Sequence, residues 1–268
     1  MTEHAAQSKP AQESAPTSAS AAIRAPDHDE WLRAASDPTL TSDQALALLA
    51  RPDLPSDVIE QLAKNRSVVT KRKVKIALAC HAHTPRHVSV PLIRQFYTFD
   101  LMKVALSPVV PGDVKVSADG ILIARLKTIN LGERLTLARR ASGRIAGALL
   151  LDANERIMHA ALENARLTEA LVVRATLKPA ASAALVQMVS QHAKWSLRRD
   201  VQASLLRTEY LSLARALGFA QEISPGRLRE ILRSSRLPER IKSQLLIETS
   251  SKRAARRKGK ILPLQSDL

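Results

Sequence analysis

Hydrophobic positions in the middle of the chain follow a helical period. Between Trp31 and Ile247, apolar residues recur at spacings of three and four within short segments, which is the pattern of amphipathic α-helices with one buried stripe. Three such stripes are Val58, Ile59, Leu62 and Ala63; Val74, Ala77 and Leu78; and Val88, Leu92, Ile93 and Phe96. Each predicts a helix of about three turns. Helices this short are marginal alone, so we expect them to bury their stripes on neighbouring helices.

Prolines mark where several of these helices begin. Thr84-Pro85 and Ser224-Pro225 place a hydroxyl residue directly before a proline. A hydroxyl suits the N-cap, and proline suits the first helical position, where its missing N–H costs nothing. Pro55, Pro111 and Pro238 predict further helix starts.

The second half of the chain repeats the first. Residues 56–122 match residues 182–248. At an offset of 126, Ser56, Ile59 and Leu62 align with Ser182, Leu185 and Met188. One inserted residue then moves the offset to 127, at which Arg72, Val74, Leu78, Leu101 and Pro111 face Arg199, Val201, Leu205, Leu228 and Pro238. The matches fall on apolar stripes and helix starts. They predict either a duplication or a multiple of a shorter repeat.

The local cadence resembles a known repeat family. The segment Pro52–Asn65, followed by Lys73–His81 and Thr84-Pro85, is similar to the repeat of HEAT-like and leucine-rich-repeat-variant α-solenoids, and the cadence returns in Asp152–Glu169. The resemblance covers about residues 40–248 and implies an all-α solenoid of short stacked helical hairpins, with an extended face for a partner. Iron–sulfur members of the variant family carry an N-terminal cysteine cluster. This chain has a single cysteine, so no cluster is expected.

Composition supports the all-α class. Aromatic residues make up 3% of the chain and glycine occurs eight times, so the core must consist of Leu, Ala, Val and Ile, which suit packed helices. The single Cys80 excludes a disulfide framework and is typical of a reduced, cytoplasmic protein. No apolar run of 18 or more residues exists, so no membrane span is expected.

Charge and composition also divide the chain. We expect residues 1–28 to be a disordered tail, residues 29–250 to form the α-solenoid, and residues 251–268 to be a basic tail after a helix that ends near Ser250. The solenoid would comprise two related halves, about 40–125 and 165–250, with a connecting helical segment. The formal net charge is +16; residues 1–30 carry −3, so the remainder carries +19. A strongly basic protein favours anionic partners.

The cations gather in four places that could contact nucleic acid. These are Lys71, Arg72, Lys73 and Lys75; Arg139, Arg140 and Arg144; Arg198 and Arg199, which match Lys71 and Arg72; and the C-terminal run with Lys252, Arg253, Arg256, Arg257 and Lys258. On one face they would follow a phosphate backbone. Alternatively, the arginines tie neighbouring repeats together or cover apolar stripes. The C-terminal run could equally be a solubilising tail or contact an anionic membrane surface.

The sequence gives little support for a metal site. Cys80, His81, His83 and His87 lie close in sequence, but Cys80 and His81 diverge on a helix, and helix-terminal histidines are the commoner explanation. We therefore predict no metal and no cofactor.

No catalytic motif is present in the sequence. HEAT-like alkylpurine DNA glycosylases offer one enzymatic comparison, because Trp195 precedes Arg198 and Arg199 and could line a cleft for an extruded base. Core packing is the alternative role for Trp195.

The sequence thus predicts a non-enzymatic helical-repeat scaffold for a macromolecular partner. Nucleic acid is the leading partner class because of the basic residues. A protein–protein scaffold without a nucleic-acid role is the closest alternative, and a DNA glycosylase is a more distant one.

Overall fold

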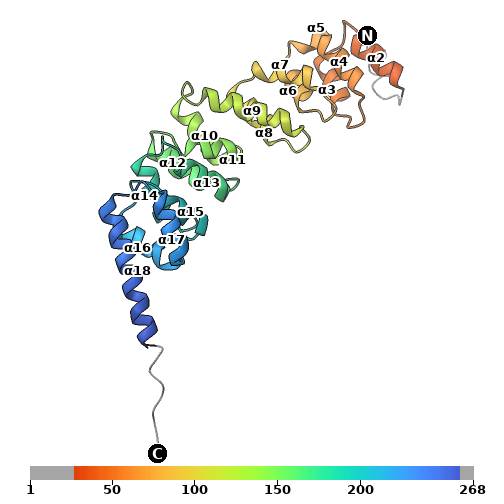
Figure 1. Ribbon diagram of the computed structural model, residues 1–268. Coiled ribbons are helices and arrows are strands. Elements are labelled where there is room, and N and C mark those ends of the chain that lie inside the picture. Colours follow the sequence, from red (N-terminus) through yellow and green to blue (C-terminus); the bar gives the residue numbers. More distant parts are fainter. Residues whose placement is uncertain (1–26, 260–268) are drawn as a thin grey trace, which may run out of the picture. The chain divides into compact units, whose positions relative to one another are not determined.

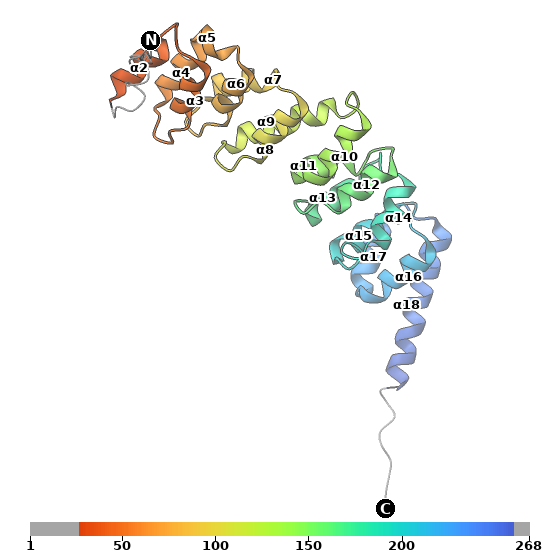
Figure 2. The same ribbon diagram turned by 180° about the vertical axis from the view of Figure 1, so that it is seen from behind.

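In the computed structural model, which describes residues 27–259 and the side chains of residues 27–250, every regular element is a helix. Seventeen helices and no strand occur in this range, which confirms the predicted all-α class. The chain divides into two compact units, Met1–Ile121 and Leu122–Leu268. Figures 1 and 2 show the order of the helices from two sides.

The helices are short, as their stripes predicted. The first unit contains α2 (His28–Ser36), α3 (Ser42–Leu49), α4 (Ser56–Lys64), α5 (Arg66–Val69), α6 (Arg72–Cys80), α7 (Arg86–Arg94), α8 (Thr98–Leu106) and most of α9 (Gly112–Arg125). The second unit contains α10 (Leu131–Arg140), α11 (Gly143–Leu149), α12 (Glu155–Leu162), α13 (Glu169–Thr176), α14 (Ala183–Gln191), α15 (Arg199–Leu205), α16 (Leu213–Glu222), α17 (Pro225–Arg233) and α18 (Glu239–Gly259).

Proline positions set several helix starts. Helices α4, α7, α9 and α18 begin directly after Pro55, Pro85, Pro111 and Pro238, and α17 begins at Pro225. The capping prediction for Thr84 is wrong, because Pro85 occupies the N-cap and the Thr84 hydroxyl donates to the Leu78 carbonyl instead. Ser224 is the N-cap of α17 but makes no side-chain cap bond.

Alternate helices pack on one another within each unit. In the first unit α2 contacts α4, and α3 contacts α6, which contacts α8; in the second, α10 contacts α12, and α11 contacts α13, which contacts α15. Their apolar stripes form the core, where Ile59, Leu62, Leu78, Leu137 and Ile145 are fully buried. This packing satisfies the expectation that such short helices depend on their neighbours.

One close approach in the second unit requires glycine. A Cβ on Gly143, at the start of α11, would overlap the carbonyl oxygen of Arg166, and one on Gly147 would press against Leu171. Two glycines on one face therefore let α11 lie close to α13 and the loop before it.

The helix boundaries repeat at a constant offset. Each of seven helices starts 127 residues before a counterpart: α2 and α12, α3 and α13, α4 and α14, α6 and α15, α7 and α16, α8 and α17, and α9 and α18. We call α2–α9 the first copy and α12–α18 the second copy. The correspondence therefore begins at His28, well before the first residue matched from the sequence.

The insertion inferred between the two copies is wrong. At an offset of 127, Ile59 and Leu62 align with Val186 and Val189, and all four side chains are fully buried. The offset of 126 paired Leu62 with Met188, which is partly exposed. The two serines misled the match, because Ser182 is the N-cap of α14 whereas Ser56 is the first residue of α4, after its N-cap Pro55.

The two ends of the described chain differ from expectation. Helix α2 begins at His28, with Asp27 as its N-cap, inside the expected disordered tail, of which residues 1–26 lie outside the described range. Helix α18 continues to Gly259 rather than ending near Ser250, because Ala, Lys and Arg are good helix formers and no glycine or proline interrupts them before Gly259. In the described range no helix combines the length and apolarity that crossing a bilayer requires.

Candidate anion-binding groove in the second unit

Successive helical repeats are tied by side chains that donate to the carbonyl groups at the end of an earlier helix. The Asn65 amide, which follows α4, donates hydrogen bonds to the carbonyl groups of Ala35 and Asp37 at the end of α2, each at 2.9 Å. The Asn164 amide, after α12, donates to Ala138 (2.7 Å) and Ala141 (3.2 Å) at the end of α10. Because the last carbonyls of a helix lack partners within it, these inter-repeat side-chain bonds complete both helices.

Trp195 belongs to the same system. Its ring is 2% exposed, and its indole N–H donates to the Leu162 carbonyl at 2.9 Å. Leu162 is the counterpart of Ala35 at the 127-residue offset, so one carbonyl position is capped by an amide in the first copy and by an indole in the second. Trp195 is thus a core residue and does not line a cleft for an extruded base.

The histidines beside Cys80 also link repeats. His81 Nε2 donates to the Arg51 carbonyl (2.9 Å) while its Nδ1 accepts from the His83 N–H (3.2 Å), and His83 Nδ1 donates to the Leu54 carbonyl (2.9 Å). Both nitrogens of His81 are therefore occupied. Burial raises the pKa of the Cys80 thiol, which disfavours the thiolate that binds metal. The described residues contain no cluster of three or more His, Cys, Asp and Glu side chains suited to a metal ion.

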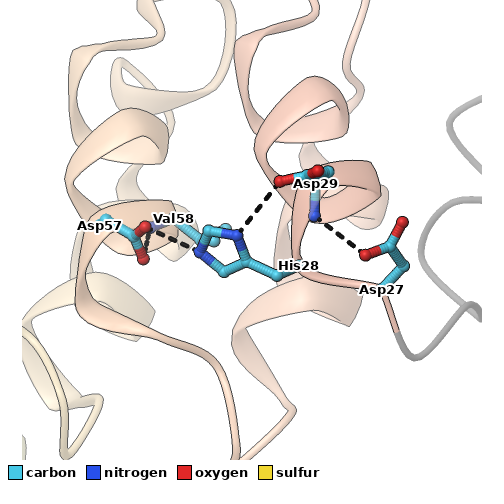
Figure 3. Close-up of polar contacts among 5 residues, drawn as sticks. All are labelled: Asp27, His28, Asp29, Asp57 and Val58. Atoms are coloured by element: carbon cyan, nitrogen blue, oxygen red, sulfur yellow. Dashed lines mark hydrogen bonds and ion pairs between the residues drawn. The ribbon is translucent and has the colours of Figure 1, made fainter.

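Paired charges connect the N-terminal ends of helices in the first unit. Figure 3 shows His28 of α2 between two carboxylates, with Nε2 2.7 Å from Asp57 Oδ2 of α4 and Nδ1 3.5 Å from Asp29 Oδ1. Further along, His87 lies 3.4 Å from Glu60, and Arg86 lies 3.3 Å from Asp113. The hydrogen bond to Asp57 raises the pKa of His28 above its usual value of 6.5.

The first predicted basic cluster lies at the start of α6, and one member has a structural partner. Arg72 forms a bidentate pair with Asp100 of α8, with Nε–Oδ2 and Nη2–Oδ1 distances of 2.8 and 2.9 Å. Asp100 is 2% exposed, so this pair uses the guanidinium to satisfy a buried carboxylate. Lys75 donates to the side chain of Gln95 at 3.0 Å. Lys71 and Lys73 are exposed and have no ion-pair partner among the described side chains.

The middle cluster does not share one hollow. Arg139, near the end of α10, lines a hollow of about 730 Å³ together with Arg156, His159, Glu155 and Glu163. Arg140, the last residue of α10, is exposed, and its carbonyl accepts a bond from Arg166. Arg144, in α11, is also exposed. Basic and acidic residues are balanced in this hollow.

The third cluster adjoins a groove over α13, α15 and α17. The groove has a volume of about 560 Å³ and is lined by Glu169, Ala170, Val173, Arg174, Asp200, Ala203, Arg207 and Arg227. A hollow of about 230 Å³ shares Arg227 and includes the predicted residue Arg199 of α15. Arg198, the N-cap of α15, is exposed beside them. Two of the sequence-predicted cations thus lie at the edge of this groove rather than within it.

Contacts inside the groove orient its arginines. Arg227 Nη2 lies 3.2 Å from Asp200 Oδ1, and Arg207 Nε donates to Ser234 Oγ at 3.2 Å. The Arg174 side chain has no hydrogen-bond or ion-pair partner among the described side chains. The three guanidinium groups are the arrangement that binds anionic oxygen atoms through paired N–H donors.

The duplication supplies an internal control for these arginines. At an offset of 127 the residues that correspond to Arg174, Arg207 and Arg227 are Ala47, Cys80 and Asp100. The helices start at matching positions in the two copies, and in the first copy they do so without arginine at any of the three positions. Arg227 and Arg207 also bond to Asp200 and Ser234, whereas Arg174 makes no such bond, so the second copy differs from the first by exposed guanidinium groups that its pattern of helices does not explain.

Further arginines follow the groove along the chain. We define the arginine-rich segment as the five exposed residues Arg227, Arg229, Arg233, Arg236 and Arg240. Their counterparts in the first copy are Asp100, Met102, Leu106, Val109 and Asp113, none of them basic. The Arg236 N–H donates to the Arg207 carbonyl at 3.0 Å, which joins this segment to the end of the groove.

The groove does not stand out in the sequence because its members are single arginines, Arg174 in α13, Arg207 in the turn after α15 and Arg227 in α17. The signal in the sequence that marks the groove is the mismatch between the two copies, such as Arg207 against Cys80. Of the C-terminal run, Lys252, Arg253, Arg256, Arg257 and Lys258 lie on the backbone of α18, and their side chains lie outside the described residues.

Comparison of the chain with protein-family models, with curated proteins and with solved structures gave no match.

Proposed function

We propose that this protein is a non-enzymatic helical-repeat scaffold of the HEAT-like α-solenoid type that binds nucleic acid through the groove over α13, α15 and α17. The observation that carries the proposal is the presence of Arg174, Arg207 and Arg227, and of the arginine-rich segment, in only one of two copies whose helices start at matching positions. Packing of α10 on α12, of α11 on α13, and of α13 on α15 supports the solenoid type.

The charge of the two units supports a polyanionic partner. The first unit has 14 basic and 13 acidic residues, a net charge of +1, whereas the second has 27 and 12, a net charge of +15. Phosphate backbones bind such surfaces chiefly by releasing counterions, and guanidinium groups add paired hydrogen bonds to the phosphate oxygens. Asp200 neutralises part of Arg227 within the groove, so Arg174 and Arg207 would contribute most to phosphate contacts.

The proposal is tested by exchanging the groove arginines in the full chain. Arg174, Arg207 and Arg227 are replaced by glutamine together, and affinity for labelled duplex DNA and RNA is measured between about 50 and 200 mM salt. We expect weaker binding and a slope of log K against log salt that is shallower by about 0.9 per lost phosphate contact, or about 2.7 for three.

A matched control separates the groove from net charge. Replacing Arg139, Arg156 and Arg215 by glutamine removes the same charge from α10, α12 and α16, outside the groove. We expect a smaller loss of affinity in this variant. Equal losses in the two triple variants would show that only overall charge matters, and no binding at low salt would rule out the nucleic-acid role.

A further inference from the structure

One exposed aromatic ring in the first unit lies against a fixed cation. Tyr97, the N-cap of α8, is 70% exposed, in a chain with only seven Phe, Trp and Tyr residues. The guanidinium carbon of Arg72 lies 5.2 Å from the centroid of its ring. Tyr97 is the most exposed of these seven side chains.

Arg72 is also held in place by an acidic partner. Its bidentate pair with the buried Asp100 fixes the guanidinium group, and the cation–π contact in turn orients Tyr97. The neighbouring bond from Lys75 to Gln95 ties α6 to the loop that carries Tyr97. The ring is therefore oriented before any ligand arrives, which lowers the entropic cost of stacking on it.

The second copy has the same link between helices but no aromatic residue at the position of Tyr97. The link from Lys75 to Gln95 has an equivalent in the second copy, where Gln202 donates to Glu222 at 3.0 Å. The counterpart of Tyr97 is Ser224, so the second copy builds the same helix junction without a ring. Tyr97 is thus an addition to the junction rather than a part of its packing.

The cations next to Arg72 in the sequence indicate the class of ligand. Lys71 and Lys73 flank Arg72, are exposed and have no ion-pair partner among the described side chains. Cations at the start of a helix are unfavourable for the helix dipole, so α6 gains no stability from them. Single-stranded nucleic acid is bound by exposed aromatic rings that stack on its bases together with cations that contact its phosphates.

We propose that Tyr97 is a stacking platform for one base of a single-stranded nucleic acid, with Lys71 and Lys73 as contacts to the adjoining phosphates. The inference shares with the proposed function only the class of ligand, since it concerns the other unit and rests on different residues. It adds a preference for unpaired bases, which a groove of arginines alone would not give.

The test compares a labelled oligothymidylate with an abasic strand that has the same number of phosphates. Tyr97→Ala should weaken binding of the oligothymidylate by at least about fivefold, because base stacking on an aromatic side chain is a large term. Tyr97→Phe should retain the affinity, and binding of the abasic strand should not respond to either change. Tyr210→Ala removes a second exposed tyrosine, in the second unit, and should have no effect.

Thermal unfolding of each variant verifies that it is folded. An unchanged affinity of folded Tyr97→Ala for the oligothymidylate would overturn the inference and would favour a protein partner for the ring. The groove triple variant distinguishes the two proposals: if it loses duplex binding while Tyr97→Ala loses nothing, only the platform fails. If Tyr97→Ala weakens binding while the groove and control triples behave alike, only the groove fails.

Discussion

The two copies of the helical pattern have the same layout and different surfaces. Residues 28–125 and 155–252 share helix starts at an offset of 127, yet their net charges are +3 and +7. An interaction present in both copies belongs to the architecture, whereas an exposed group that is present in only one copy is a candidate for a separate role. This contrast distinguishes structural arginines from candidate binding arginines in a chain that has many of them.

Both copies have an ion pair between corresponding helices, but the acidic and basic partners are exchanged. The first copy joins α6 to α8 through Arg72 and Asp100, and the second joins α15 to α17 through Asp200 and Arg227, with the charges on opposite helices. The first pair includes a buried carboxylate, while both partners of the second are more than half exposed. What is retained is a connection between two helices, and its strength differs between the copies.

The largest effect is expected from the buried amide in the second unit. Asn164 is 1% exposed and makes bonds to Ala138, Ala141 and the Arg166 N–H. Asn164→Ala leaves several buried groups without partners and should lower the free energy of unfolding by about 2–4 kcal/mol. Asn65→Ala, at a half-buried site, should cost about 1–2 kcal/mol. Urea denaturation monitored by circular dichroism gives both values.

The exposed Gln187 of α14 provides a control for the asparagine variants. Gln187→Ala should change the free energy of unfolding by less than about 0.5 kcal/mol. If Asn164→Ala were as mild as this control, the inter-repeat side-chain bonds would not hold the repeats together.

The reversed ion pairs should differ in strength. Asp100→Ala should lower Tm by a few degrees, because a buried carboxylate with two charge-assisted bonds is lost. Asp200→Ala should lower Tm by less than about one degree, since its pair is exposed to solvent. Differential scanning calorimetry measures both, and equal shifts would contradict the distinction between the copies.

The smallest effect concerns the pH dependence of His28. The bond to Asp57 raises the pKa of His28, and its loss in Asp57→Asn should return that pKa toward 6.5. NMR titration of the His28 ring resonances measures the change. A His28 pKa that does not fall in Asp57→Asn would show that the contact in Figure 3 is not formed in solution.

The sign of the stability effect follows from both partners. A raised pKa of His28 means that its contribution is complete at low pH and is lost as pH rises through the folded value. Burial opposes ionisation of Asp57, but the bonds from His28 and the Val58 N–H outweigh it and lower its pKa, so its contribution is lost as pH falls below about 3.8. The pair should therefore be most stabilising between these limits, and addition of salt should weaken it.

The sequence was sufficient for the helices and much of the core. Stripes such as Val58, Ile59 and Leu62 were visible because a 3.6-residue period marks one buried face. The prolines located five helix starts for the local reason that they lack an N–H. The length of α18 was underestimated, because a run of cations was interpreted as a tail although lysine, arginine and alanine favour helix.

The groove depended on contacts that no local pattern contains. Arg174, Arg207 and Arg227 line one groove although they are 33 and 20 residues apart in sequence. Arg72 illustrates the opposite error: its place in a run of cations suggested a phosphate contact, but its partner, Asp100, lies 28 residues away. A cationic residue in the sequence can either bind a ligand or form an ion pair within the protein, and the side chains packed near it in the fold determine which of the two it does.

In the inter-repeat side-chain bonds the donor follows its acceptor in the sequence, and this order matters for folding during synthesis. Asn65, His81, Asn164, Trp195 and Ser235 each donate to a carbonyl that precedes them by 23–33 residues. During synthesis, the end of a helix must wait for the next repeat to emerge from the ribosome before it is capped. The growing chain therefore carries one unfinished repeat at its leading edge, and each newly completed repeat stabilises the one made before it.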